Sequence, residues 1–238
     1  MQRVFSGAQP TGTLHIGNYL GAVNNWVKLQ DNYECIYSIV DLHSITVNYT
    51  SDQLIPQILK NLATYIACGI DPNKSIIFQQ SSVPHHSELF WLLSCLTPIG
   101  NLNRMTQFKE KSGENKQKSS LGLYCYPVLQ AADIMLYKAN TVPIGEDQVQ
   151  HLELTNDIIK FFNNRFNSKF FSPVKTIIGD NKRIMSLRDG TVKMSKSDSS
   201  EYSRINLTDT DDEINNKIKK SATDSYTTLC DELDKDLM

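Results

Sequence analysis

Several classes of protein are excluded by what the sequence lacks. No apolar run in its 238 residues approaches the ~20 residues of a membrane-spanning helix, so we do not expect insertion in a bilayer. Its five cysteines are scattered and form no Cys-x-x-Cys pair, which argues against a disulfide framework or a structural zinc site. The N-terminus has a strand-like Arg3-Val4-Phe5 and neither an apolar signal core nor an arginine-rich presequence. These absences favour a cytoplasmic protein.

A strong charge of either sign is also lacking. With 24 Lys and Arg against 26 Asp and Glu, the net charge is −2, so the field of the whole molecule gives no reason to expect nucleic acid. Any contact with RNA must come from local patches. The length allows one sizeable core and a small appendage.

Strand-like and helical patterns alternate along the chain. Between about 52 and 68, for example, Leu54, Ile58 and Leu62 recur at helical spacing. We expect strands at 4–5, 35–40, 75–78, 141–144 and 175–178, and helices near 16–29, 52–68, 89–96, 126–137, 146–162 and 209–220. Pro98 to Gly100 is expected to break the chain between helices, and 112–120 and 189–203 to form mobile loops. The alternation predicts an α/β fold: a Rossmann-like, doubly wound parallel sheet with helices on both faces.

The segment from Phe5 to Asn18 (FSGAQPTGTLHIGN) carries the first chemical signal. A strand runs into a Gly/Pro turn and a helix start, which places backbone N–H groups where phosphate can bind. Gly17 leaves room for a flat adenine, and His15 can donate a hydrogen bond to a phosphate oxygen. Taken alone, the segment fits a capped strand–turn–helix connection equally well.

The second signal is Lys193-Met194-Ser195-Lys196-Ser197 in a Gly/Asp/Ser-rich loop. Two lysines three residues apart can turn toward a polyphosphate, and the two serine hydroxyls can steady the loop. A lone Lys-x-x-Lys is more often a solvated basic loop.

Together, His15-Ile16-Gly17-Asn18 and the Lys193–Ser197 segment resemble the HIGH and KMSKS signatures of class I aminoacyl-tRNA synthetases, in that family's order. Asn18 stands where the second His of the signature would be, a variant found in the tryptophan branch. Blocks between the two motifs resemble the bacterial-type tryptophanyl-tRNA synthetases: Val40–Thr46, Arg104–Ser112, Tyr126–Ile134 and Gly145–Gln148. The resemblance runs from residue 3 to about residue 224.

This resemblance implies that tryptophan is activated by ATP, as a Mg²⁺ complex, and transferred to tRNA(Trp), with no protein-bound metal. It implies catalytic roles for His15, Asn18, Lys111, Lys193 and Lys196, with the lysines stabilising the departing pyrophosphate. ATP binding is implied for Gln9, Thr11, Gly17, Asn18, Gly145, Asp147, Ile184, Lys193, Met194, Ser195 and Lys196. A homodimer is the implied assembly.

Tryptophan needs an apolar slot and an acceptor, because its indole N–H can only donate. By resemblance Asp133 is that acceptor, although alone it would fit a paired structural Asp. The other residues implied to bind tryptophan are Phe5, Gly7, Gln9, Val40, His43, Tyr126, Gln130, Val142, Ile144 and Gln148. His85 and His86 are interpreted as capping and surface residues, and His151 as structural.

The domain division is expected at residue 205, with the catalytic domain at 1–205 and the start of a helical C-terminal domain at 206–238. Full-length members of the family continue into a helical domain that reads the anticodon. We therefore expect a truncated chain that forms the adenylate poorly and does not charge tRNA efficiently.

Three other interpretations stay open. The first is the tyrosine-specific sister enzyme, because Gln130 replaces the Met of the best-known bacterial tryptophan enzymes and also occurs in the tyrosine-specific enzymes. A HIGH-containing nucleotidylyltransferase would transfer adenylyl groups without tRNA. A non-catalytic regulatory or RNA-binding paralogue would need none of this chemistry.

Overall fold

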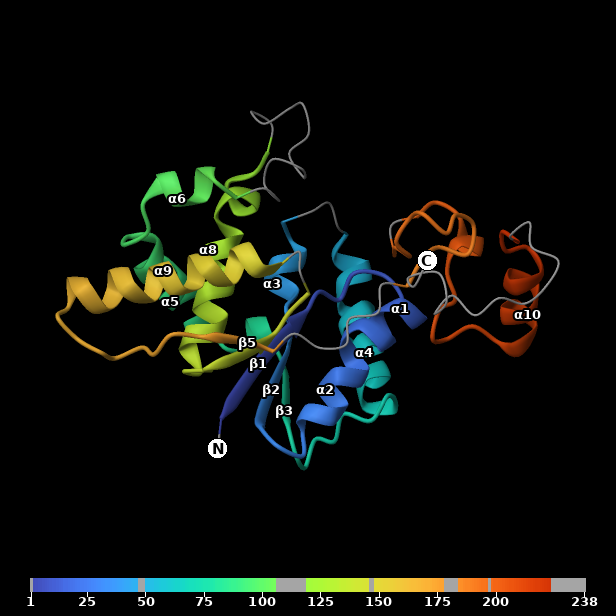
Figure 1. Cartoon of the computed structure of the whole chain (residues 1–238), viewed down its shortest axis with the longest axis horizontal. Helices are drawn as coiled ribbons and strands as arrows, with labels where there is room; N and C mark the ends of the chain where they lie inside the picture. Colours follow the sequence, from blue (N-terminus) through green and yellow to red (C-terminus); the bar gives the residue numbers. More distant parts are fainter. Residues whose placement is uncertain are drawn as a thin grey trace, which may run out of the picture.

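The computed structural model describes residues 2–46, 50–105, 119–145, 148–177, 184–196 and 198–223. Five parallel strands form one sheet in the order β3-β2-β1-β4-β5 (Figure 1). The strands are β1 (Arg3–Ala8), β2 (Glu34–Ile39), β3 (Ile76–Gln79), β4 (Thr141–Pro143) and β5 (Lys175–Ile177). The chain runs outward from β1 to β3 and then returns to place β4 on the other side of β1. The topological switch point, where α/β folds bind ligands, therefore lies between β1 and β4.

Helices cover both faces of the sheet, as the sequence predicts (Figure 1). In the core on one face, Val4 and Tyr37 lie with Trp26 of α2 (Asn24–Leu29) and with residues of α4 (Ser51–Ala67). In the other core, Phe5 and Ile36 lie with residues of α8 (Leu121–Leu136) and α9 (Val149–Arg165). Neighbouring strand residues thus enter opposite cores, which is the period of two that a sheet buried on both faces requires.

Some element boundaries differ from the prediction. The helix expected at 16–29 consists of α1 (Ile16–Asn18), the π-helical η1 (Tyr19–Val23) and α2. Helix α8 begins before the expected 126, because Ser120 caps it by accepting the Leu123 N–H at 3.2 Å. After the break at Pro98 the chain re-enters a helix. The remaining helical elements are α3 (Asp41–Ser44), η2 (Gln80–Ser82), α5 (His85–Ser94), α6 (Ile99–Asn103), η5 (Glu201–Ser203) and α10 (Asp211–Lys219).

Helix α10 lies at the end of the molecule away from α9 (Figure 1). Two backbone bonds join the segment before it to the start of α1: Ile16 N–H to Ile205 O at 2.9 Å, and Leu207 N–H to Leu14 O at 2.8 Å. The domain boundary at residue 205 stays a prediction. None of the helices in the described ranges combines the length and the apolar composition of a membrane span.

Candidate active site

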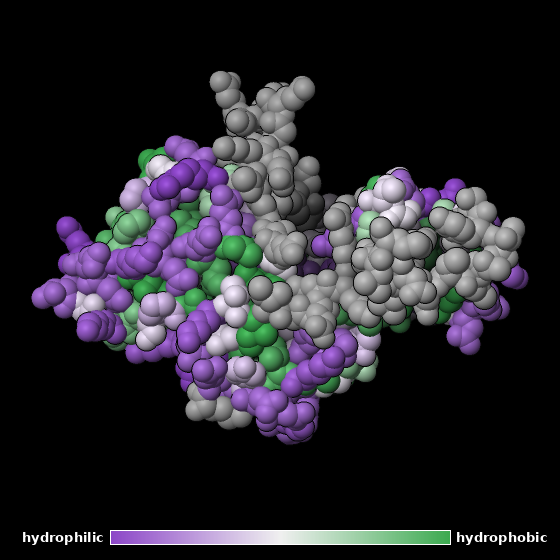
Figure 2. Space-filling view, viewed as in Figure 1, coloured by the Kyte–Doolittle hydropathy of each residue, from purple (hydrophilic) through white to green (hydrophobic). Residues whose placement is uncertain are grey.

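A cavity of about 640 Å³ lies at the carboxyl ends of β1 and β4. Strand β1 pairs with β2 along its whole length, but with β4 only through Val4 and Thr141. The two strands are therefore not held together where they end, and the cavity is lined from both. On the face of the molecule turned toward the viewer, Figure 2 shows hydrophobic surface between α9 and α2.

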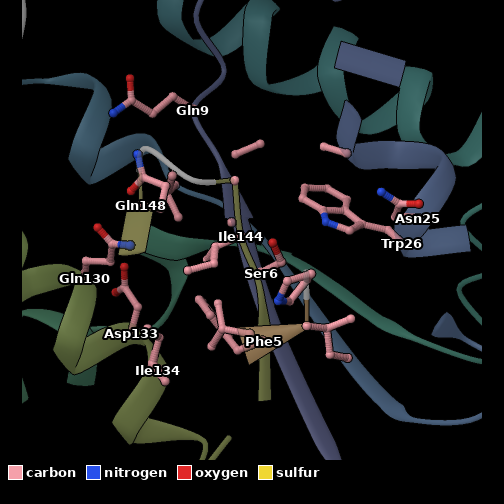
Figure 3. Close-up of a pocket in the computed structure, with 18 of the residues that line it drawn as sticks. Phe5, Ser6, Gln9, Asn25, Trp26, Gln130, Asp133, Ile134, Ile144 and Gln148 are labelled. Atoms are coloured by element: carbon pink, nitrogen blue, oxygen red, sulfur yellow. The ribbon is translucent and has the colours of Figure 1, made fainter. Parts of the chain in front are cut away.

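All eleven residues that the sequence assigns to tryptophan line this one cavity: Phe5, Gly7, Gln9, Val40, His43, Tyr126, Gln130, Asp133, Val142, Ile144 and Gln148. They come from β1, the segment around α3, α8, and the segment from β4 to α9. The Val40 side chain, just after β2, lies so close to β1 that position 7 requires glycine: a Cβ there would lie 2.7 Å from Val40 Cγ1. The apolar side chains form the walls. Gln130 lies next to Asp133, and Gln148 and Gln9 lie farther along the same side (Figure 3).

Among the described residues that line the cavity, the acidic one is Asp133, which is 1% exposed. His43 Nε2 lies 2.8 Å from its Oδ2, while Gln80 Nε2 and His86 Nδ1 lie 2.7 and 2.6 Å from its Oδ1. Burial raises the pKa of Asp133, but the hydrogen bonds from the two histidines outweigh it and hold the pKa below its ordinary value. The cavity therefore contains a buried, ionised acceptor.

Sequence reasoning missed two of these partners. The interpretation of His86 as a surface residue is wrong: its side chain is fully buried, whereas the adjacent His85 is exposed. Gln80 is also fully buried and had no assigned role. It follows directly after β3, so its place at the carboxyl end of a strand was the available signal. His151, interpreted as structural, is buried with its Nε2 2.9 Å from the Tyr126 hydroxyl.

A second wall of the cavity was not expected either. Asn25 and Trp26 lie across β1 from Gln130 and Asp133 (Figure 3). With Gly21, Ala22, Lys28 and Leu29 they line the cavity on the side of η1 and α2.

The residues assigned to the nucleotide divide into two groups. Gln9 and Gly145 line the cavity itself. The others described gather around the start of α1. A Cβ on Gly17 would lie 3.0 Å from His15 Nδ1 and 3.4 Å from Ile184 Cβ. Gly12, whose φ is +66°, lies beside Lys196: a Cβ on Gly12 would be 3.7 Å from Lys196 Cβ. Met194 N–H donates to Ile184 O at 3.0 Å, so both motif segments meet here.

The charge state of this second group follows from burial and from its cations. Burial, with the charges of Lys196, Arg204 and Lys193, lowers the pKa of His15 to about 4. Burial also lowers the pKa of Lys196 to about 8. His15 Nδ1 is buried without a hydrogen-bond partner among the described residues. Asn18 Oδ1 accepts the His15 backbone N–H at 3.1 Å and so holds the turn that presents this ring.

The predicted residues Lys111, Asp147 and Ser197 lie outside the described part of the chain. Thr11 and Ser195 are described and partly buried. In the described ranges, no group of three or more His, Cys, Asp or Glu residues could hold a metal ion.

Fold, cavity and the two motif segments together define a class of protein: the chain belongs to the class I tRNA synthetases for tryptophan and tyrosine, whose family description, "tRNA synthetases class I (W and Y)", matches residues 1–235. Among its relatives, the tryptophan–tRNA ligase of Rickettsia bellii is 56% identical over 93% of this chain and 68% of its own length. The tryptophan–tRNA ligase of Caulobacter vibrioides is also 56% identical, over 93% of this chain and 65% of its own.

The same fold occurs in a solved structure of tryptophanyl-tRNA synthetase from Campylobacter jejuni, complexed with ADP and tryptophan. Its TM-score is 0.85 at 35% identity, with 95% of this chain and 69% of that chain covered. The chain thus spans about two thirds of the length of these relatives.

The lowered pKa of His15 predicts a neutral imidazole at pH 7. In an NMR titration assigned with a His15→Gln variant, the His15 ring should titrate with a midpoint near pH 4. Unfolded His15 binds its proton near pH 6.5, so acidification from 6.5 to 4 should favour the unfolded chain. A midpoint near 6.5 would contradict this account of the site.

Proposed function

We propose that this chain carries the amino-acid-activating part of a tryptophan–tRNA ligase. The carboxylate of L-tryptophan attacks the α-phosphorus of ATP, tryptophanyl-adenylate forms and pyrophosphate leaves. The whole protein then transfers tryptophan to the 3′-terminal adenosine of tRNA(Trp). The proposal is supported by the identity to tryptophan–tRNA ligases and by the chemistry of the cavity.

The observation that carries the proposal is the buried carboxylate of Asp133 beside apolar walls. An indole is flat, apolar and a pure hydrogen-bond donor, and it needs this combination of walls and acceptor. Phe5, Val40, Val142 and Ile144 would contact the ring. Tyr126, Gln9 and Gln148 offer polar groups for the amino and carboxyl ends, and Gln130 lies one helical turn before Asp133.

The ATP would extend from the cavity mouth to the start of α1. Gly145 and Asp147 would hold the ribose, and Gly17, Ile184 and Met194 the adenine. A neutral His15 can donate a hydrogen bond to a phosphate, while Lys193, Lys196 and Lys111 would stabilise the pyrophosphate with the Mg²⁺ that ATP brings. Because little covalent work is left to the protein, catalysis would consist of positioning and charge stabilisation.

The assignment to the cytoplasm is supported by the four free cysteines among the described residues.

Exchange of pyrophosphate with ATP should depend on tryptophan and not on tyrosine. Replacing Asp133 with Asn keeps the shape but removes the charged acceptor, so the KM for tryptophan should rise roughly 10- to 100-fold. The KM for ATP should change less than about threefold. Each comparison is a ratio of variant to native KM, so it can be interpreted even where the chain forms adenylate slowly. Equal increases in both KM values would refute the assignment of Asp133, and activity with tyrosine would favour the sister specificity.

Lys196→Ala should lower the kcat of exchange by about 10²–10³-fold, with little change in the KM for ATP, because its charge acts on the departing pyrophosphate. Lys219, exposed on α10, provides the control, and Lys219→Ala should leave both constants unchanged. A large rise in KM with unchanged kcat would assign Lys196 to ground-state binding instead.

We further propose a homodimer. Its support is the large apolar side chains exposed on the edge strand β3 and on α5: Ile76 on β3 is 56% exposed, and Trp91 and Leu92 on α5 are 66% and 55% exposed. Sedimentation velocity should give a dimer for this chain and a monomer for Trp91→Asp. A monomeric native chain at tens of micromolar would overturn the proposal.

A further inference from the structure

The Asp133 carboxylate is held by three side chains from three elements. His43 comes from α3, Gln80 from η2 and His86 from α5, while Asp133 itself lies on α8. Each of the four residues is at most 5% exposed. Of the three partners of Asp133, His43 also lines the cavity, whereas Gln80 and His86 do not and approach the carboxylate from within the protein.

The lone pairs of this carboxylate can be counted. An ionised carboxylate offers about four acceptor positions, two on each oxygen. Gln80 and His86 occupy both positions on Oδ1, and His43 occupies one on Oδ2. One acceptor position is left on Oδ2, the oxygen that also accepts a hydrogen bond from His43 of the cavity wall.

The orientation of His86 is fixed from its other side. A carboxylate only accepts, so Nδ1 of His86 must carry the proton toward Asp133. In the neutral ring Nε2 is then an acceptor, and it lies 2.8 Å from the Tyr137 hydroxyl, which donates to it. The Tyr137 ring stacks on Phe5 of the cavity wall, with centroids 5.6 Å apart.

Gln80 is held in a similar way. Its Nε2 donates to Asp133, while its Oε1 accepts the backbone N–H of Leu42 at 3.1 Å. This backbone bond anchors the amide to α3, the helix that also carries His43.

We infer that His86 and Gln80 are positioning residues for amino-acid specificity: by occupying Oδ1 they fix the Asp133 carboxylate so that its remaining acceptor on Oδ2 meets the indole N–H. The inference rests on the proposed function. Neither residue lines the cavity, so each acts on the amino acid through the residues that it holds, and both hold Asp133. Loss of either residue weakens the binding of ligands that carry the N–H and leaves the binding of ligands that lack it less affected.

The test compares the binding of tryptophan with that of β-(3-benzothienyl)alanine, in which sulfur replaces the indole N–H. Equilibrium dissociation constants are measured by calorimetry for the native chain and for His86→Leu, which removes the donor to Oδ1. The preference of the native chain for tryptophan should fall at least about fivefold in His86→Leu. His86→Asn keeps an N–H near the place of Nδ1 and should restore most of the preference.

His85→Leu is the matched control, because His85 is the exposed neighbour on the same helix, and it should leave the preference unchanged. Should His86→Leu fail to fold, Gln80→Met removes the other donor to Oδ1 and gives the same measurement. A native chain without preference for tryptophan would overturn the part of the proposed function that makes Asp133 the acceptor of the indole N–H. If the native chain prefers tryptophan and His86→Leu, or Gln80→Met, keeps that preference, the positioning role alone is overturned. A purely structural defect would weaken the binding of both ligands equally and so leave the preference unchanged.

Discussion

A carboxylate withdrawn from water must be met by hydrogen-bond donors, or it takes up a proton and loses its charge. Asp133 satisfies this requirement through His43, Gln80 and His86, and it remains ionised in an otherwise largely apolar part of the molecule. These contacts join α3, η2, α5 and α8 near the carboxyl ends of the strands. The proposed selection of an amino acid with an indole N–H depends on this charge being kept in place.

The sheet topology puts the charged acceptor and the groups proposed to bind phosphate on either side of the same strand end. Strand β1 leads through Gly7 and Gln9 to the start of α1, and the weak pairing of β1 with β4 leaves space at the switch point. His15, Gly17 and Lys196 meet at the end of this turn, where cations and burial keep the imidazole neutral. The carboxyl group of a bound amino acid and the α-phosphate of ATP would thus meet between two sites that differ in polarity.

Much of this could be predicted from the sequence. The alternation of strand-like and helical patterns predicts the parallel sheet with helices on both faces, and the residues that the resemblance selected for tryptophan all line one cavity. His86 and Gln80 could not be assigned in the same way. They lie 47 and 53 residues from Asp133 in the chain, and neighbouring His85 has the same side chain but is exposed. Which of two adjacent histidines enters a core is decided by how α5 packs on α8, a tertiary constraint that local pattern does not contain.

The central claim is that an indole N–H donates to the Asp133 carboxylate. Tryptophan labelled with ¹⁵N at the indole nitrogen tests it most directly, through the ¹H–¹⁵N resonance of the bound ligand. The account predicts a downfield shift of the indole proton on binding and protection from exchange with water, both lost in Asp133→Asn. A bound indole proton that keeps the chemical shift and exchange rate of free tryptophan, or that is unaffected by the substitution, would contradict it.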